Sequence, residues 1–392
     1  MRQIDVICFG GNDWWYHNRD HLDIQMLSRF ARYGKAVYIN SIVMQKPNIT
    51  QNRNFTRKLI RKAKSILRGL KRTEKGFWVY SPFSLPVHHI AWARRMNERL
   101  LLLQVWLMKL RVGIQKPVVW VACPAACDVA IKIKKQRLIY QRSDRFEEYP
   151  NVDAETIRYY DRKLKAKADL TVFVNSSMYE QERAQCKKAV YIDQGVDYDM
   201  FASAERIETV PDEMREMKKP IVGFFGGIDD HTSDIGLLEK VTELLGEITF
   251  AFVGNASSDC SQLSSKDNVL MLGKKPYEQI PHYGKCFDVA ILPWRNNRWI
   301  ETCNPIKLKE YLALGKPVVS TPFPELRKYR DVVYEAKTPE EFAGCIKKAL
   351  AENGPQRIAA RRKRVHLATW DNKMQLVIDE LFGKEANSEK SN

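Results

Sequence analysis

The residue types best suited to chemistry occur in one segment, ETCNPIKLKEYLALGKPVVSTPFPE, at residues 301–325. Asn304 and Pro305 predict the start of a helix, because asparagine caps helices well and a proline at the first helical position loses no needed donor. The amides at this N-terminus, together with the helix dipole, form a site for an anion. Lys307 in the first turn adds a full positive charge, which suits a pyrophosphate.

Glu310 follows Lys307 by about one turn, beside it on the predicted helix surface, where a carboxylate can accept hydrogen bonds from a diol such as ribose. Gly315 predicts the end of the helix, and residues 317–321 predict a buried strand. A cation and a carboxylate at this spacing indicate a binding site for a nucleoside diphosphate. The alternative is an ordinary surface lysine and a glutamate that pairs with Lys307 or Lys309.

The elements around this segment alternate along the whole chain between short β-branched or aromatic runs and helical patterns, which is typical of parallel α/β folds. We expect two Rossmann-like domains, at residues 1–205 and 206–382, followed by a frayed tail at 383–392. Ligands of such sheets bind at the carboxyl ends of the strands, so the site is expected in the cleft between the domains. The predicted strands are 5–10, 35–42, 76–81, 117–123, 137–141, 170–175, 189–193, 220–227, 248–254, 269–272, 289–293 and 317–321, and the clearest predicted helices are 21–33, 235–245, 305–314, 339–351 and about 355–381.

Four segments of the second half carry a family resemblance in their order and spacing. They are GFFGGIDDHTSDIGLLEKV, ITFAFVGN, NVLMLGKKPYEQIPHYGKCFDVAILPW and the segment at 301–325. Together they resemble the C-terminal domain of GT-B glycosyltransferases of the group 1 family, and most closely the teichuronic-acid and exopolysaccharide-type bacterial enzymes. The resemblance covers residues 220–350 well and the N-terminal half only by architecture, and it implies that the C-terminal helix crosses back to the first domain.

The resemblance also implies roles for particular residues. Lys307 would contact the diphosphate of a nucleotide-sugar donor, which is expected to be UDP-linked, and Glu310 would contact the ribose hydroxyls. The two glycines after the first strand of this domain would let its loop approach the phosphates or sugar, and the backbone after 272 would face the base. The further binding residues implied are Gly226, Gly227, Gly273, Lys274, Asn304 and Pro305. No cofactor or metal is expected, because GT-B enzymes neutralise the leaving diphosphate with a helix dipole and a lysine.

One position departs from the family pattern. The family often carries a second glutamate eight residues before the first, and here that position is Thr302, with Glu301 one residue out of register. The sequence therefore assigns neither the transferred sugar nor the choice between retaining and inverting chemistry.

The N-terminal half offers one candidate catalytic residue, Asp144, in IYQRSDRFEEYPN just after a predicted strand. This segment resembles an element of the same enzymes. If the enzyme inverts, a general base must take the proton of the acceptor hydroxyl, and Asp144 is the candidate. The alternative is that Asp144 caps the next turn or pairs with Arg142 or Arg145.

A second candidate acceptor element is the loop GGNDWWYHNRD after the first strand. Its aromatic and polar side chains suit an acceptor sugar, although packing under a neighbouring helix explains one of the two tryptophans equally well. The side chains concerned are Asp13, Trp14, Trp15 and His17. The pair His88-His89 follows a proline and predicts a loop rather than a metal site.

The chain has 392 residues and a formal charge of +17, which points to polyanionic partners. Residues 53–72 hold nine lysines or arginines and no acidic residue, with apolar residues at helical spacing. A basic amphipathic helix is typical of segments that lie in a membrane interface. The alternatives are a solvated helix that packs its apolar stripe on the N-terminal domain, and nucleic-acid binding, for which no module is recognisable.

The expected cellular location of the protein follows from its N-terminal residues, its longest apolar run and its cysteines. The start MRQIDVICFGG does not resemble a signal peptide, and the longest apolar run, at 100–110, is roughly half the length that spans a bilayer. Eight scattered cysteines without a CxxC pair favour buried thiols and no structural metal. We expect a cytoplasmic protein attached peripherally to the inner face of the cell membrane.

The sequence therefore predicts a hexosyl- or glycuronosyltransferase that moves a sugar from a nucleotide-diphosphate donor to a lipid-linked or polysaccharide acceptor in cell-surface polysaccharide biosynthesis. Its expected partners are the nucleotide-sugar, this acceptor and an anionic membrane surface, and not nucleic acid. One alternative is a nucleotide-sugar epimerase or another GT-B enzyme without a membrane acceptor, which the basic helix disfavours. Another is a non-catalytic binding protein, which the joint presence of Lys307 and Glu310 disfavours.

Overall fold

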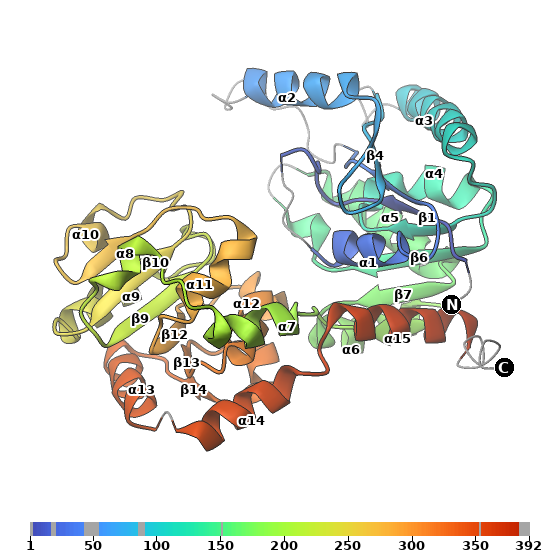
Figure 1. Ribbon diagram of the computed structural model, residues 1–392. Coiled ribbons are helices and arrows are strands. Elements are labelled where there is room, and N and C mark those ends of the chain that lie inside the picture. The colour runs from blue at the N-terminus through green and yellow to red at the C-terminus, as the bar shows by residue number, and fades with distance from the viewer. Residues whose placement is uncertain are drawn as a thin grey trace. The chain divides into compact units, whose positions relative to one another are not determined.

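The computed structural model describes residues 3–16, 21–42, 55–84, 91–149, 152–352 and 354–383. The chain forms two compact units, each built around its own sheet (Figure 1). The N-terminal unit comprises residues 1–193 together with 373–392, and the C-terminal unit comprises residues 194–372.

Within the described residues, the sheet of the N-terminal unit has eight strands in the order β3-β4-β2-β1-β5-β6-β7-β8. All neighbouring strands are parallel except β3 and β4, which are antiparallel. The central strands are fully buried, as continuous apolar runs predict for strands covered on both faces. Their bounds are β1 (Val6–Phe9), β2 (Ala36–Ile39), β3 (Leu70–Arg72), β4 (Trp78–Tyr80), β5 (Val118–Val121), β6 (Arg137–Arg142), β7 (Leu170–Phe173) and β8 (Ala189–Tyr191).

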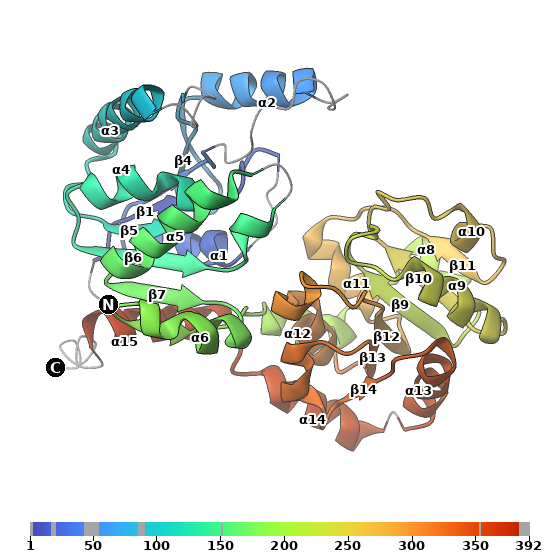
Figure 2. The ribbon, with the colours of Figure 1, turned by 180° about the vertical axis from the view of Figure 1, so that it is seen from behind.

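Helices cover both faces of this sheet. Helix α1 lies on one face and α4 and α5 lie on the other, as the two opposite views show (Figures 1 and 2). The helices of the unit are α1 (Leu22–Phe30), α2 (Phe55–Leu67), α3 (Ala91–Val112), α4 (Cys127–Lys132), α5 (Ala154–Lys167), α6 (Ser176–Glu182) and most of α15 (Trp370–Phe382). Among the helices described, none combines the length and the apolar character needed to cross a bilayer.

The described part of the C-terminal unit contains a six-stranded, all-parallel sheet in the order β11-β10-β9-β12-β13-β14. Its strands are β9 (Ile221–Phe225), β10 (Thr249–Val253), β11 (Val269–Met271), β12 (Val289–Leu292), β13 (Val318–Ser320) and β14 (Val333–Glu335). Its helices are α7 (Tyr198–Ala202), α8 (Asp212–Arg215), α9 (Ile235–Leu244), α10 (Ser261–Ser264), α11 (Ile280–Gly284), α12 (Ile306–Ala313), α13 (Pro339–Ala351) and α14 (Pro355–Val365). Two α/β units with parallel sheets confirm the predicted fold class.

The basic segment at 53–72 does not form one helix. Helix α2 ends at Leu67, and Gly69 then adopts a positive φ of 61°, a conformation that glycine tolerates at little cost. The chain continues into β3, where Leu70 pairs with Tyr80 of β4. Leu70 and the two basic residues after it therefore belong to a hairpin, and the expected helical stripe is shorter than predicted. Residues 53 and 54 lie outside the described part of the chain.

The end of the chain also differs from the expectation. The predicted helix at about 355–381 is divided into α14 and α15 near Ala368, whose carbonyl accepts a hydrogen bond of 2.8 Å from the Val196 amide. Trp370 is buried where α15 begins, and a Cβ at residue 195 would lie 2.5 Å from its ring, so Gly195 is needed there. The strand–helix series alone did not indicate this packing.

The two units divide at Asp193, whereas 205 was the expected boundary. Residues 373–383 group with the N-terminal unit, as the expected return of the C-terminal helix to the first domain implies, although the expected domain bounds placed residues up to 382 in the C-terminal domain. Two ion pairs contribute to this grouping: Lys373 pairs with Asp193, and Lys188 lies 2.9 Å from Glu380. Apolar side chains of α15 supply the rest, since Met374, Val377 and Ile378 are buried. The predicted frayed tail lies outside the described residues from 384 onward.

Candidate functional site

The C-terminal unit has a topological switch point between β9 and β12. The sheet continues from β9 to β10 and β11 on one side, and from β12 to β13 and β14 on the other. In open α/β sheets, ligands bind outside the carboxyl ends of the strands at such a point. The loop that follows β9 begins with Gly226 and Gly227, and the loop that follows β12 leads into α12.

Gly226 and Lys307 are in direct contact at this point. Gly226 has a φ of 143°, and a Cβ at this residue would lie only 2.2 Å from the Lys307 ammonium nitrogen. The same ammonium lies 4.6 Å from the centre of the Phe224 ring. A Cβ at residue 254 would lie 1.8 Å from the Gly226 carbonyl oxygen, so Gly254 brings the end of β10 against the same loop. The structure thus brings together Lys307 and the glycine loop that the sequence predicted.

Helix α12 is fixed to the end of β9 by Tyr311. The Phe225 amide donates a hydrogen bond of 2.8 Å to the Tyr311 hydroxyl, and the two rings are 4.3 Å apart. On the same helix the buried Lys309 donates to the Gln194 carbonyl. Lys309 therefore has a structural contact within this unit.

The start of α12 differs from the prediction by one residue. The N-cap is Pro305, with φ −75° and ψ 123°, so the helix begins at Ile306 and Asn304 is not its cap. The extended ψ of Pro305 keeps it outside the helix. Because a proline side chain cannot accept a hydrogen bond, the N-cap residue supplies no acceptor for the first-turn amides. The positive end of the α12 dipole lies next to Lys307 and adds to its charge.

Glu310 is not on the helix surface beside Lys307. Its side chain is buried, and the Tyr277 hydroxyl donates a hydrogen bond of 2.8 Å to its Oε1 atom. The Tyr277 hydroxyl also lies 3.4 Å from Asp197 Oδ2. Tyr277 orients the carboxylate, and the sequence analysis missed it. The signal was available, because Tyr277 stands in the segment that follows the expected base-facing residues.

Those residues, Gly273 and Lys274, form the exposed turn after β11. Gly273 has a φ of 66°, which favours glycine, and a Cβ there would contact nothing within 4 Å. The next residue, Lys275, is paired with Glu213 of α8. The turn therefore leads directly to Tyr277, and the open side of Gly273 leaves room for a planar group.

The position of the missing second glutamate holds a structural threonine. Thr302 is buried, and its hydroxyl donates a hydrogen bond of 3.0 Å to the Trp299 carbonyl. Glu301 is exposed. The loop after β12 is also tied to the loop after β9, since the Asn297 amide group donates to the His231 carbonyl at 2.7 Å and the Arg295 amide to the Thr232 carbonyl at 2.9 Å. The two loops of the switch point thus support each other.

In the N-terminal unit, Asp144 follows β6 in a partly buried loop. The Tyr149 hydroxyl donates to its carboxylate at 3.2 Å. Burial raises the pKa of the Asp144 carboxyl above its usual 3.8, against the opposing effects of this hydrogen bond and of the charges of His21 and Arg142. A carboxyl with a raised pKa is the state expected of a general base.

Arg142 positions the Asp144 loop without pairing with its carboxylate. The guanidinium donates to the Asp144 carbonyl at 2.8 Å and to both oxygens of Glu147, at 3.0 and 2.8 Å. On its other side it pairs with Glu182 and Asp161. The pairing of Asp144 with Arg142 that the sequence left open is therefore not formed, and Arg142 instead holds the backbone.

The loop after β1 is largely engaged by the protein itself. Asp13 accepts hydrogen bonds from the Trp15 amide at 3.1 Å and from the Asn40 side chain at 3.2 Å. The Trp14 ring packs edge-on against Phe77, with ring centres 5.0 Å apart, and the Arg68 guanidinium lies 4.6 Å from the centre of the Trp15 ring. These contacts explain both tryptophans as packing residues. His17 and the pair His88-His89 lie outside the described residues.

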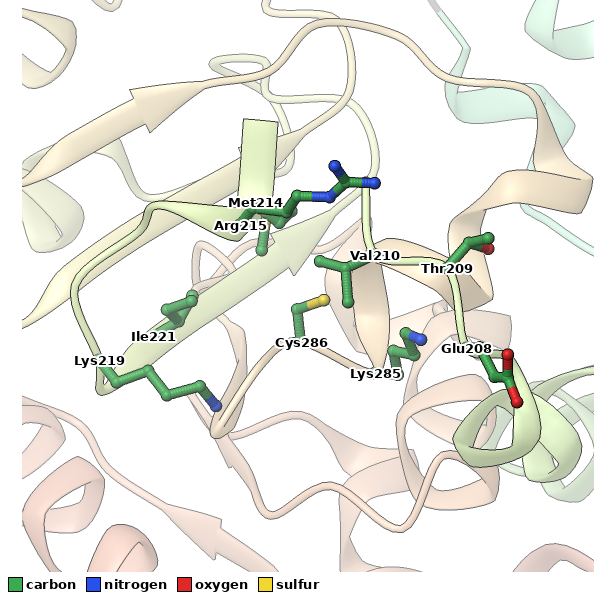
Figure 3. Close-up of a pocket in the computed structure, with 9 residues that line it drawn as sticks. All are labelled: Glu208, Thr209, Val210, Met214, Arg215, Lys219, Ile221, Lys285 and Cys286. Carbon is green, nitrogen blue, oxygen red and sulfur yellow. The ribbon is translucent and has the colours of Figure 1, made fainter. Parts of the chain in front are cut away.

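A separate pocket of about 660 Å³ lies at the amino end of β9 in the C-terminal unit (Figure 3). It includes Ile221, the first residue of β9, whereas the glycine loop follows the last residue of that strand. Its cations have protein partners: Lys219 pairs with Asp288 at 3.1 Å, and Lys285 donates to the Ile207 carbonyl. The pocket is therefore distinct from the switch point. In the described part of the chain, no three histidine, cysteine or acidic side chains gather as a metal ion requires.

Comparison with known proteins shows that the C-terminal unit is similar to glycosyltransferases. Residues 219–352 match the family model described as glycosyl transferases group 1. TuaH of Bacillus subtilis, whose name provisionally assigns it as a glycosyltransferase of teichuronic acid biosynthesis, is 24% identical over 251 residues, or 58% of this chain. The match covers 62% of the length of TuaH, which is less than two thirds.

Solved structures match over nearly the whole chain. Sucrose-phosphate synthase from Thermosynechococcus elongatus gives a TM-score of 0.67 at 13% identity, with 95% of this chain and 97% of that one covered. HepE of Anabaena, in complex with UDP, gives a TM-score of 0.62 at 13% identity, with 97% and 99% covered. The fold is thus that of GT-B glycosyltransferases.

The anchoring of α12 can be tested by Tyr311→Phe. This change leaves the buried Phe225 amide without its acceptor, so we expect the free energy of unfolding to fall by about 1–3 kcal/mol in urea titrations. Tyr334→Phe is a matched control in the same unit, because it removes a hydroxyl bonded to Glu352, which remains solvated, and roughly 0.5 kcal/mol is expected. Equal losses in both variants would show that the Tyr311 hydroxyl has no special part in holding α12.

The raised pKa of the Asp144 carboxyl can be tested with the variant Asp144→Asn. Because the pKa of the Asp144 carboxyl is raised on folding, its ionisation opposes folding. This penalty is absent below pH 3.8, where the carboxyl is protonated in both states, and is complete once the pH exceeds the raised pKa. We therefore expect the variant to gain stability relative to the natural chain as the pH rises from about 4 to 7 in urea titrations. A loss of stability that does not change with pH would indicate a structural carboxylate instead.

Proposed function

We propose that this chain, whose C-terminal unit carries a group 1 glycosyltransferase domain on a GT-B fold, is a glycosyltransferase of cell-surface polysaccharide biosynthesis. It moves a sugar from a nucleoside-diphosphate donor to a lipid-linked or polysaccharide acceptor at the cytoplasmic face of the membrane. The observation that carries the proposal is the contact of Lys307 with Gly226 at the start of α12, one turn before the Glu310–Tyr277 pair.

The proposed donor site uses the charge of the switch point. When the sugar leaves, negative charge develops on the diphosphate, and Lys307 together with the α12 dipole stabilises it without a metal ion. Gly226 and Gly227 carry no side chains, so the backbone after β9 can approach the phosphates. A preorganised cation of this kind acts more strongly in the transition state than in the bound donor, which is the condition for catalysis.

The nucleoside is recognised next to the diphosphate. Glu310, oriented by Tyr277, accepts hydrogen bonds from the ribose hydroxyls, and the turn at Gly273 and Lys274 lies against the base. A UDP-linked donor is supported by the related fold of HepE, whose structures are titled as complexes with UDP and with UDP-glucose. No resident cofactor takes part in the proposed reaction.

The acceptor side belongs to the N-terminal unit. In an inverting transfer, Asp144 takes the proton of the acceptor hydroxyl, and its raised pKa makes it a stronger base than an exposed carboxylate. Arg142 holds the loop that carries it. A membrane-bound acceptor is supported by the likeness to TuaH and by the basic residues at 53–72, which attract an anionic leaflet. An epimerase would have no use for such a face.

The donor site is tested by Lys307→Ala and Glu310→Gln, with calorimetric titration of UDP-glucose and UDP. Losing a charge-assisted contact to the diphosphate is expected to weaken binding by about 10–100-fold in Lys307→Ala. Glu310→Gln is expected to reduce the preference for UDP over its 2′,3′-dideoxy analogue. Lys337→Ala, an exposed lysine of the same unit, is the control and leaves binding unchanged. Full affinity in both site variants would remove the donor-site assignment.

The reaction class is tested with a panel of nucleotide sugars and membrane extracts as acceptor source. A transferase or a slow donor hydrolase releases nucleoside diphosphate, an epimerase changes only the sugar, and a non-catalytic protein changes neither. Release of nucleoside diphosphate that depends on Lys307 is the expected result. Transfer in Asp144→Asn is expected to fall by roughly 100-fold or more if this carboxylate is the base, while donor binding stays intact.

A further inference from the structure

The exposed apolar side chains of the described residues are concentrated in one part of the N-terminal unit. Of the fourteen large hydrophobic residues that are exposed, nine lie between residues 60 and 110. We call these nine the outer apolar surface: Ile60, Leu67, Phe83, Trp92, Met96, Leu103, Trp106, Leu107 and Leu110. Scattered apolar residues need no explanation, but a concentration of this kind marks an interaction site.

Helix α3 contributes most of this surface because it is apolar on two faces. Its inner face packs on the unit through the buried Leu101 and Val105. Its outer face carries Leu103, Trp106 and Leu110, which are 52%, 55% and 60% exposed. These three outer residues have no protein cover in the described part of the chain, although α3 also carries exposed arginines.

Helix α2 contributes two residues to this surface, since Ile60 and Leu67 are 55% and 85% exposed. The same helix contacts the unit through polar side chains: Ser65 is completely buried against the Ser81 hydroxyl at 2.6 Å, and Lys62 donates to the Ser41 carbonyl at 3.1 Å. Ile60 and Leu67 therefore do not pack on the N-terminal unit.

The surface is continuous with the end of the sheet. After β4, Phe83 is held to α3, because its amide donates to the Gln104 side chain at 2.9 Å and its carbonyl accepts from the same side chain at 2.9 Å. The Phe83 ring is exposed at this edge. Both views place α2 and α3 at the same end of the N-terminal unit (Figures 1 and 2).

Basic side chains on the same helices indicate which kind of partner covers these apolar residues. Lys64, Arg95, Arg99 and Arg111 are exposed on the same two helices, and residues 53–72 contain no acid. A second copy of the chain would bring like charges together at the edge of a shared apolar contact. An anionic lipid surface is complementary to both the apolar residues and the charges.

We propose that the outer apolar surface inserts into the interfacial layer of an anionic bilayer, with α3 as the main inserting element. Trp92 and Trp106 lie at the level of the headgroups, where indole rings are favoured. The exposed lysine and arginines contact the lipid phosphates. The inference deepens the proposed function, on which it rests for its purpose, by naming the face that meets the membrane. It also moves the principal anchor from the basic segment to α3.

The test is flotation of the full chain with vesicles of phosphatidylcholine alone and of phosphatidylcholine with phosphatidylglycerol. The natural chain is expected to float with the anionic vesicles, and less so at high salt. The double variant Leu103→Ser, Leu107→Ser is expected to bind them on the order of tenfold more weakly, because two apolar side chains no longer leave water. Leu244→Ser with Leu367→Ser is the matched control, since these leucines are 48% and 67% exposed in the C-terminal unit, and less than a twofold change is expected.

Two further measurements separate the competing occupants. Lys64→Gln with Arg99→Gln is expected to lose most of the preference for anionic vesicles. Light scattering is expected to give a monomer for both the natural chain and the leucine variant. Equal flotation of the leucine variant and the natural chain, or a dimer that the leucine changes dissociate, would overturn the proposal. Donor binding is measured on the same samples, so failure of the membrane inference is distinguishable from failure of the proposed function.

Discussion

The hydrogen bond from the Phe225 amide to the Tyr311 hydroxyl is the constraint on which the C-terminal unit depends most. It joins the last residue of β9 to the middle of α12, so the glycine loop and the helix N-terminus keep a fixed separation. A glycine suits residue 226, because its φ is 143° and the Lys307 ammonium lies where a Cβ would be. A cation that is placed before a ligand arrives needs little reorganisation when charge develops beside it.

In the N-terminal unit, a cluster of buried charged side chains positions the loop after β6. Arg142 and Lys165 are almost fully buried and share the carboxylates of Asp161 and Glu182. Such a cluster costs much desolvation and is weak evidence for stability, yet removing one partner would leave an uncompensated charge. Because Arg142 also binds the Asp144 carbonyl, the cluster defines where the loop after β6 lies.

The sequence predicted the alternation of strands and helices, and hence the parallel sheets, because buried strands and amphipathic helices differ in period. It also assigned Lys307 and the glycine loop to the same expected donor site, and the structure places the two in contact. It did not predict β3, since a basic hairpin strand has no apolar period, or the burial of Glu310, which depends on a tyrosine distant in the chain. The exposure of Ile60 and Leu67 on α2 was equally hidden, because an amphipathic pattern gives two faces and does not say which one the fold covers.

Helix α15 begins in one unit and is completed in the other. Trp370 packs against Gly195 of the C-terminal unit, while Lys373 pairs with Asp193 of the N-terminal unit. The N-terminal unit is therefore assembled from two separate stretches of chain, and cutting the chain at 193 would strip it of a helix whose Met374, Val377 and Ile378 are buried. During synthesis this unit stays incomplete until α15 has left the ribosome, whereas the C-terminal unit is one uninterrupted stretch and can close first.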